Sequence, residues 1–213
     1  MHIPDGFLDT KTWATLSAVS FGTVAIGLKL TNKNLGEKNI PLLGVTAAFI
    51  FAAQMLNFPV AGGTSGHFMG ASLAALLLGP WSSLLVMATV LLVQCFVFQD
   101  GGLTALGANI FNMGIIGSFL SFYLFRVLNR LIPGKSKPIF GIRVFLVGWF
   151  SIVAASGFCA VELGLSGTVP LNLSLMSMLG THALIGIGEG LVTVLVLQFI
   201  KKIRPDLLEL DKI

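Results

Sequence analysis

The chain has 213 residues, of which 55% are hydrophobic and 10% charged, and its formal net charge is +4. Soluble domains carry about 25% charged residues, so this composition excludes a soluble globular protein, and the apolar excess excludes a disordered one. The apolar residues form long runs instead of the short alternating segments of a membrane β-barrel. We therefore predict an all-α integral membrane protein, with residues 1–213 forming a single transmembrane domain.

Seven apolar stretches are predicted to form helices. Because a membrane span needs about 20 residues, the third stretch is short, and the 71–98 region could be one kinked element. The Gly79-Pro80 pair marks a sharp break, and we favour two helices because only then do the charges give a consistent topology. In chain order the stretches cover about 11–30, 40–57, 67–78, 81–98, 103–131, 142–165 and 173–203.

The basic residues cluster in three places beside these stretches. Lys and Arg that flank spans mark the cytoplasmic side, and with seven spans all three clusters fall on one side. The N-terminus then lies outside and the C-terminus in the cytoplasm, whereas six spans would misplace the last cluster. The net charge therefore indicates topology in a lipid bilayer and not a nucleic-acid surface. The clusters hold Lys29, Lys33, Lys38, Arg126, Arg130, Lys135, Lys137, Arg143, Lys201, Lys202, Arg204 and Lys212.

The first residues offer a metal chelate. The opening Met1-His2-Ile3-Pro4-Asp5-Gly6 has no basic n-region, so we expect no signal peptide, and the bulky His2 should leave Met1 in place. The amine of Met1, the amide nitrogen of His2 and the His2 imidazole could fill three corners of a square around one ion. Nitrogen sets of this kind suit Ni(II) or Cu(II), and imidazole also suits other divalent ions.

A second histidine, His67, follows the glycine-rich segment 59–66. Taken alone, His67 is more simply a solvated residue of an external loop. Together with His2, which is predicted on the same outer face, it could supply the fourth nitrogen of the plane. The geometry is possible, but the spacing does not establish it.

The N-terminal segment and the glycine-rich loop resemble segments of a known protein family. The opening MHIPDGFL and the loop GGTSGHFMG resemble the CbiM/NikM family, the membrane substrate-binding subunits of energy-coupling-factor transporters for cobalt and nickel. The resemblance covers the whole chain, and neither motif departs from the family pattern. It implies about seven transmembrane helices, with the N-terminal segment inserted into the bundle, and a metal site made by the Met1 amine, His2 and His67.

The resemblance also implies the function and the partners. The chain would capture Ni(II) or Co(II) as transported substrate at the extracellular side of a prokaryotic cell membrane. It would work with a transmembrane coupling subunit, two ATPase subunits and a small accessory membrane subunit. Its own sequence agrees that energy comes from elsewhere, since the nearest match to a phosphate-binding loop begins with Asn129 instead of glycine. We expect no enzyme activity and no cofactor, and the residues do not decide between nickel and cobalt.

Four polar residues inside the predicted helices are candidates for an outer shell around the metal. His182 and Glu189 lie two turns apart on one helix face, and Asn109 and Asn112 share a face of another. They could orient the ligands or the N-terminal segment, or they could be an interhelical hydrogen-bond network. Glu162 and Asp100 are expected near the outer surface, where they could attract cations but are more simply solvated residues.

Two other functions are compatible with parts of the sequence. Gly63-Thr64-Ser65-Gly66 matches the GxSG of rhomboid-like intramembrane serine proteases, with Ser65 as nucleophile and His182 as base. That chemistry needs the two side chains within hydrogen-bond reach, and it leaves the N-terminal motif unexplained. The chain could also be a stand-alone metal channel or carrier, although its ionisable residues, with Glu189 as the main deep exception, concentrate on one side instead of lining a path.

Overall fold

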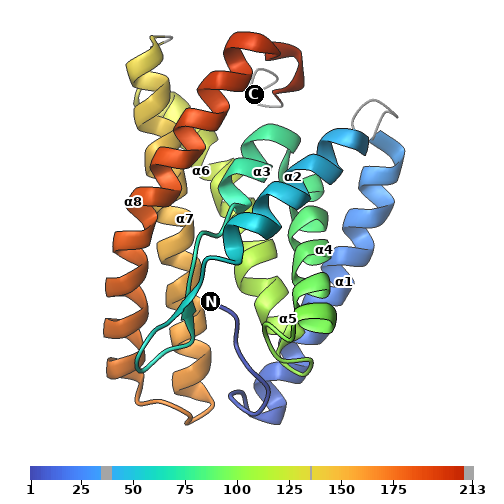
Figure 1. Cartoon of the computed structure of the whole chain (residues 1–213), viewed down its shortest axis with the longest axis vertical. Coiled ribbons are helices and arrows are strands. Elements are labelled where there is room, and N and C mark those ends of the chain that lie inside the picture. Colours follow the sequence, from blue (N-terminus) through green and yellow to red (C-terminus); the bar gives the residue numbers. More distant parts are fainter. Residues whose placement is uncertain (35–39, 135, 209–213) are drawn as a thin grey trace.

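The computed structural model describes residues 1–34, 40–134 and 136–208, so Lys38, Lys135 and Lys212 of the predicted basic clusters lie outside the described residues. The fold is a bundle of α-helices with one small β-hairpin (Figure 1). Each of the seven predicted apolar stretches corresponds to a helix or a continuous helical segment. The elements are α1 (Thr10–Asn34), α2 (Ile40–Gln54), β1 (Phe58–Pro59), β2 (Ser65–Gly66), α3 (Ala71–Leu78), α4 (Pro80–Phe98), α5 (Leu106–Asn109), the π-helix η2 (Ile110–Ile116), α6 (Gly117–Leu131), α7 (Lys137–Leu165), α8 (Leu171–Ile203) and the 3-10 turn η3 (Pro205–Leu207).

Five helical segments of the described chain are long and apolar enough to cross a membrane. They are α1, α4, α7, α8 and the continuous run α5–η2–α6 over Leu106–Leu131. The 15-residue α2 is shorter, and α3 has eight residues that are nearly all buried inside the protein. An all-α membrane architecture is therefore confirmed, with five segments of spanning length and two shorter apolar helices.

The 71–98 region forms two helices and not one kinked element. Gly79 separates α3 from α4 with a φ of 83°, a left-handed conformation that glycine adopts without strain. Pro80 then begins α4, where its missing N–H costs nothing. The chain turns back on itself, because the Ser83 hydroxyl in α4 donates to the carbonyl of Ala71 at the start of α3, 3.1 Å away.

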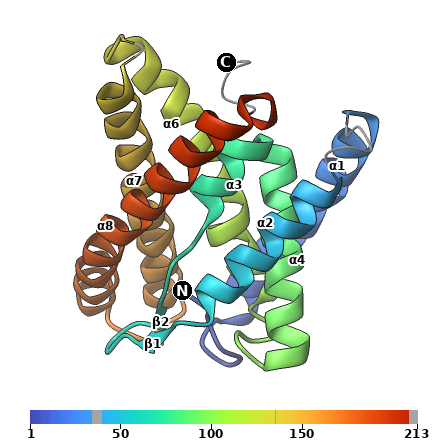
Figure 2. The ribbon, with the colours of Figure 1, turned by 45° about the horizontal axis from the view of Figure 1, so that its top comes forward.

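The most extensive helix–helix contact is between α7 and α8, which run side by side (Figure 2). Gly148 of α7 faces Gly190 of α8, and a Cβ atom on Gly148 would lie 3.0 Å from the Gly190 Cα. Small residues at such crossings allow two helix backbones to approach closely in a membrane. This approach brings the buried side of α8 toward α3 at the centre of the bundle.

The basic ends of the helices gather at one end of the molecule. The C-terminal end of α1, the link between α6 and α7, and the C-terminal end of α8 all lie at the top of Figure 1. The N-terminal residues occupy a different place: they run from the lower end of α1 into the middle of the bundle, beside the β-hairpin (Figures 1 and 2). Met1 and Ile3 belong to the main hydrophobic core.

Candidate metal centre

The first three residues form a segment without regular secondary structure that is buried among the helices. Met1 and Ile3 are fully buried and His2 is 3% exposed. Asn109 holds this segment by both backbone groups of Ile3: its Oδ1 accepts from the Ile3 N–H at 2.8 Å, and its Nδ2 donates to the Ile3 carbonyl at 3.2 Å. The Gly102 N–H also donates to the Ile3 carbonyl, at 2.8 Å. The structure thus confirms the prediction that the N-terminal segment is inserted into the helix bundle.

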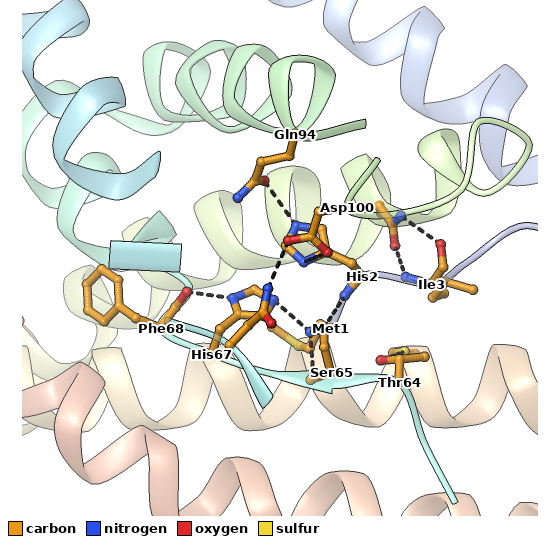
Figure 3. Close-up of polar contacts among 12 residues, drawn as sticks. Met1, His2, Ile3, Thr64, Ser65, His67, Phe68, Gln94 and Asp100 are labelled. Carbon is orange, nitrogen blue, oxygen red and sulfur yellow. Dashed lines mark hydrogen bonds and ion pairs between the residues drawn. The ribbon is translucent and has the colours of Figure 1, made fainter. Parts of the chain in front are cut away.

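The β-hairpin brings His67 to the N-terminal amine. β1 and β2 pair antiparallel, with Pro59 opposite Ser65, and the chain leaves β2 directly into His67. The Met1 amine lies 2.7 Å from His67 Nε2, 2.5 Å from the Ser65 carbonyl and 2.9 Å from the Ser65 hydroxyl. The His2 amide N–H donates to the same hydroxyl, at 3.0 Å (Figure 3). Ser65 therefore aligns the first peptide group against His67.

Hydrogen bonds fix which ring nitrogens are free to bind a metal. His67 Nδ1 lies 2.7 Å from the Phe68 carbonyl, and His2 Nε2 lies 3.0 Å from the Gln94 Oε1. Both partners are acceptors, so these two nitrogens carry the hydrogens and donate. His67 Nε2 and His2 Nδ1 are then left with lone pairs, and the two rings stack with centroids 4.5 Å apart. Such outer contacts set tautomer and ring orientation in metal-binding histidines.

Burial keeps these groups uncharged. Removal from water lowers the pKa of the Met1 amine from 8.0 to about 5 and the pKa of His2 from 6.5 to about 3. Burial likewise lowers the pKa of His67 well below 6.5, and the nearby amine lowers it further. Desolvation disfavours a charged base, so the amine and both imidazoles carry free lone pairs at neutral pH. The amine and the two imidazoles therefore need not lose a proton before they bind a metal ion.

The distances fit neighbouring corners of a metal plane. Two nitrogens bonded to one ion at about 2.0 Å and at a right angle would be about 2.8 Å apart. The amine and His67 Nε2, at 2.7 Å, are close to that separation. No group of three His, Cys, Asp or Glu side chains comes together anywhere in residues 1–34, 40–134 and 136–208. Any metal site at this place depends on the backbone nitrogens of Met1 and His2.

Of the two asparagines, only Asn109 contacts the N-terminal segment. Asn112 lies in the π-helical turn η2, and its Nδ2 donates to Glu162 Oε2 at 2.7 Å. The wider turn of the π-helix begins between the two residues. Glu162 is 6% exposed, so the expectation of a solvated residue was wrong: the π-helical turn brings an amide donor to it. Asp100, whose side chain is 20% exposed, is partly buried.

His182 and Glu189 are both buried on α8, as expected for one helix face. The Glu189 carboxylate accepts from the backbone N–H groups of Met69 and Gly70 and from the Ser72 hydroxyl, at 2.8–2.9 Å. It therefore satisfies the free N–H groups at the start of α3, two residues beyond His67. His182 Nδ1 donates to the Met178 carbonyl at 2.8 Å, within its own helix.

The geometry does not favour a Ser65–His182 pair. The Ser65 hydroxyl contacts the Met1 amine and the His2 amide. His182 Nδ1 is engaged by Met178, and its Nε2 has no hydrogen-bond partner within the described part of the chain. A serine nucleophile needs a base within hydrogen-bond reach of its hydroxyl, and among the described contacts His182 approaches Ser65 at the backbone and not at the hydroxyl.

Sequence reasoning missed Gln94, and it named Asp100 only as a residue near the outer surface. Gln94 is a fully buried polar residue in the apolar helix α4, where it orients His2. Asp100 follows the C-terminal end of α4, and its Oδ1 lies 3.4 Å from His2 Nδ1. A polar side chain inside a membrane helix is a functional candidate in its own right, so Gln94 had a usable signal.

Comparison with known proteins shows which proteins this chain resembles. The sequence profile described as "CbiM: Cobalt uptake substrate-specific transmembrane region" matches residues 2–207. The "Putative fused nickel transport protein NikMN" of Archaeoglobus fulgidus is 41% identical over 98% of this chain and 68% of its own length. The "Cobalt transport protein CbiM" of Sorangium cellulosum is 34% identical over 98% of this chain and 95% of its own length.

The fold matches as well. A crystal structure titled "Truncated Transition metal Transporter" superposes with a TM-score of 0.89 at 32% identity, covering 95% of this chain and 99% of that chain. Together with apolar helices of spanning length, these matches identify a multi-pass membrane protein of metal transport. The chain belongs to the CbiM family of cobalt uptake substrate-specific transmembrane regions.

Proposed function

We propose that this chain captures a divalent transition-metal ion, Ni(II) or Co(II), as its transported substrate. The ligands are the Met1 amine, the amide nitrogen and Nδ1 of His2, and Nε2 of His67. The observation that supports this most directly is the 2.7 Å approach of the amine to the bare Nε2 of His67, with both groups buried. In the proposed complex, three nitrogens come from the first two residues and the fourth from the loop.

The donor set favours Ni(II) over Co(II). Planar all-nitrogen sites suit Ni(II) and Cu(II), and the adjacent chelate rings of the first two residues impose a plane. Binding through the amide nitrogen releases one proton. The relatives named above include both nickel and cobalt transport proteins, so a direct comparison of the two ions in solution is the appropriate test.

The site is proposed to open to the extracellular side of a prokaryotic cell membrane. Basic residues flanking spans mark the cytoplasmic side, and the described basic helix ends gather at one end of the molecule (Figure 1). The N-terminal segment leaves α1 at the other end. With the basic end in the cytoplasm, the N-terminus enters the bundle from outside, so the ion is taken from the outer medium.

Capture alone does not move an ion against a gradient. We propose that the chain is the substrate-binding subunit of an energy-coupling-factor transporter, working with a transmembrane coupling subunit, two ATPase subunits and a small accessory membrane subunit. The resemblance of the N-terminal and loop motifs to the CbiM/NikM subunits supports this role. A transport role instead of catalysis is supported by the names of the relatives and by the Ser65 hydroxyl, which contacts the Met1 amine and the His2 amide.

Blocking the amine tests the proposal. A cleavable tag ahead of Met1 converts the amine into an amide, and the buried pocket around Met1 has no room for added residues. We expect the tagged protein to lose stoichiometric binding of NiCl2 in calorimetry, and cleavage that restores Met1 as the first residue to recover it. A tag at the C-terminus serves as the matched control. Unchanged binding by the N-terminally tagged protein would refute the chelate.

A further inference from the structure

Asp100 approaches the proposed metal site more closely than any other acidic side chain of the described residues. Gln99, in a left-handed conformation with φ 55°, ends α4 and turns the chain so that the Asp100 N–H donates to the Gln94 carbonyl at 3.0 Å. The side chain of the same Gln94 accepts from His2 Nε2. One residue thus positions both the carboxylate and the imidazole.

The carboxylate oxygen of Asp100 and the Nδ1 atom of His2 are both hydrogen-bond acceptors, and they lie next to each other. Asp100 Oδ1 lies 3.4 Å from His2 Nδ1, which is buried and has no hydrogen-bond partner in the described residues. Because His2 Nε2 carries the ring hydrogen, Nδ1 offers a lone pair to the carboxylate. A buried lone pair beside an anionic oxygen is unfavourable unless a positive group lies between them.

The separation of the two atoms suits a metal ion. Bonds of about 2.1 Å from one ion to an imidazole nitrogen and a carboxylate oxygen would subtend about 110° at the observed distance. The Asn57 side chain donates to the other oxygen of Asp100, Oδ2, at 3.0 Å. Oδ1 is therefore the oxygen available to a cation.

Asp100 also lies on the path from solvent. A cavity of 740 Å³ is lined by Asp100, His2 and Ser65, among others. The Asp100 side chain is 20% exposed, against 2% for that of His2. An ion that enters this cavity reaches the carboxylate before it reaches the buried nitrogens.

Asp100 also balances the positive charge of the proposed metal complex. A divalent ion bound through one deprotonated amide leaves a net charge of about +1 on the complex, in a place where Met1, His2 and His67 are buried. An unpaired buried charge is costly. The carboxylate of Asp100 supplies the matching negative charge, because Glu189 is held by the start of α3 and Glu162 by Asn112.

We propose that Asp100 is an additional metal ligand, which binds the incoming ion together with His2 Nδ1 before the four-nitrogen plane closes and stays beside it as the counter-charge. This inference rests on the proposed function, because it uses the same His2 nitrogen. It assigns to Asp100 a contact with the substrate itself, so the residue should affect both the rate and the strength of binding.

The test compares Asp100→Asn with Asp100→Glu and with Asp206→Asn, a control that removes one acidic charge from an exposed ion pair with Arg204. Asparagine keeps the size of the side chain and an oxygen for Asn57, so the fold should be kept, as thermal unfolding of the metal-free protein will check. NiCl2 is mixed with each protein in a stopped-flow instrument at low and high salt, and affinity is measured by competition with a chelator.

We expect Asp100→Asn to lower nickel affinity by about 10- to 100-fold, to slow association and to flatten the salt dependence of its rate. Asp100→Glu should recover much of the rate, and Asp206→Asn should match the unmodified protein. Wild-type affinity and rate in Asp100→Asn would overturn this inference alone, as would equal losses in the Asn and Glu variants. Failure of the unmodified protein to bind nickel would instead overturn the proposed function.

Discussion

Changing the pH tests whether the nitrogens of the site are uncharged before the metal arrives. Burial lowers the pKa of the Met1 amine to about 5 and that of His2 to about 3. At pH 7 an amine with a pKa of about 5 is protonated in about 1% of molecules, and the imidazoles are neutral as well. Nickel binding should therefore release about one proton, the one from the His2 amide.

The free peptide Met-His-Ile-Pro-Asp is the matched control, since it offers the same chelate without burial. Its amine, with the ordinary pKa of 8.0, is about 90% protonated at pH 7 and its imidazole about 25%, so binding should release about two protons. Calorimetry in buffers of different ionisation enthalpy counts these protons. A release of two or more protons from the protein at pH 7 would refute the buried, neutral amine.

The pH dependence follows with a definite sign. A bound metal competes with protons, so affinity falls as pH falls. Between about pH 6 and 8 the logarithm of the protein's affinity constant should rise by about one for each pH unit, and below about pH 5 the slope should steepen as the amine also gains a proton. A slope of two throughout pH 6–8 would contradict the lowered pKa of the amine.

Three further predictions test the surroundings of the site. Replacing Gln94 by Leu removes the acceptor for His2 Nε2 and should lower nickel affinity in calorimetry by about 10- to 100-fold. The Gln94→Glu variant keeps an acceptor and should lose less affinity. Equal affinities in both variants would contradict the role of Gln94. Glu189→Ala leaves two buried N–H groups at the start of α3 without an acceptor and should reduce the free energy of unfolding by about 2–6 kcal/mol. Thermal unfolding in detergent measures this loss. The control variant Glu189→Gln should lose less stability. Asn109→Ala should weaken nickel binding because Asn109 holds the N-terminal segment. Asn112→Ala breaks only a contact with another helix and should leave nickel binding unchanged. A larger loss of nickel affinity in Asn112→Ala than in Asn109→Ala would contradict the role given to Asn109.

Much of the fold could be predicted from the sequence because the membrane is a demanding solvent. Every backbone polar group in a bilayer must be satisfied within its own segment or by a neighbour, so long apolar runs can only be helices. The break at Gly79-Pro80 also followed from local chemistry, since glycine adopts the left-handed conformation and proline begins a helix. The ends of the apolar stretches correspond to the helix ends to within a few residues.

The sequence alone also determined the candidate ligands, because a free amine followed by His2 is a chelate whatever the fold, and His67 stood out in a chain with three histidines. Only the tertiary structure decided which nitrogens are available. Gln94, from a distant helix, and the Phe68 carbonyl orient the two rings, and burial in the bundle lowers the pKa of the amine. The π-helical turn η2 separated Asn109 from Asn112, a local departure from the α-helical period that no spacing rule predicts. Contacts between residues far apart in sequence depend on how the helices pack, and that packing brought Asp100 to His2.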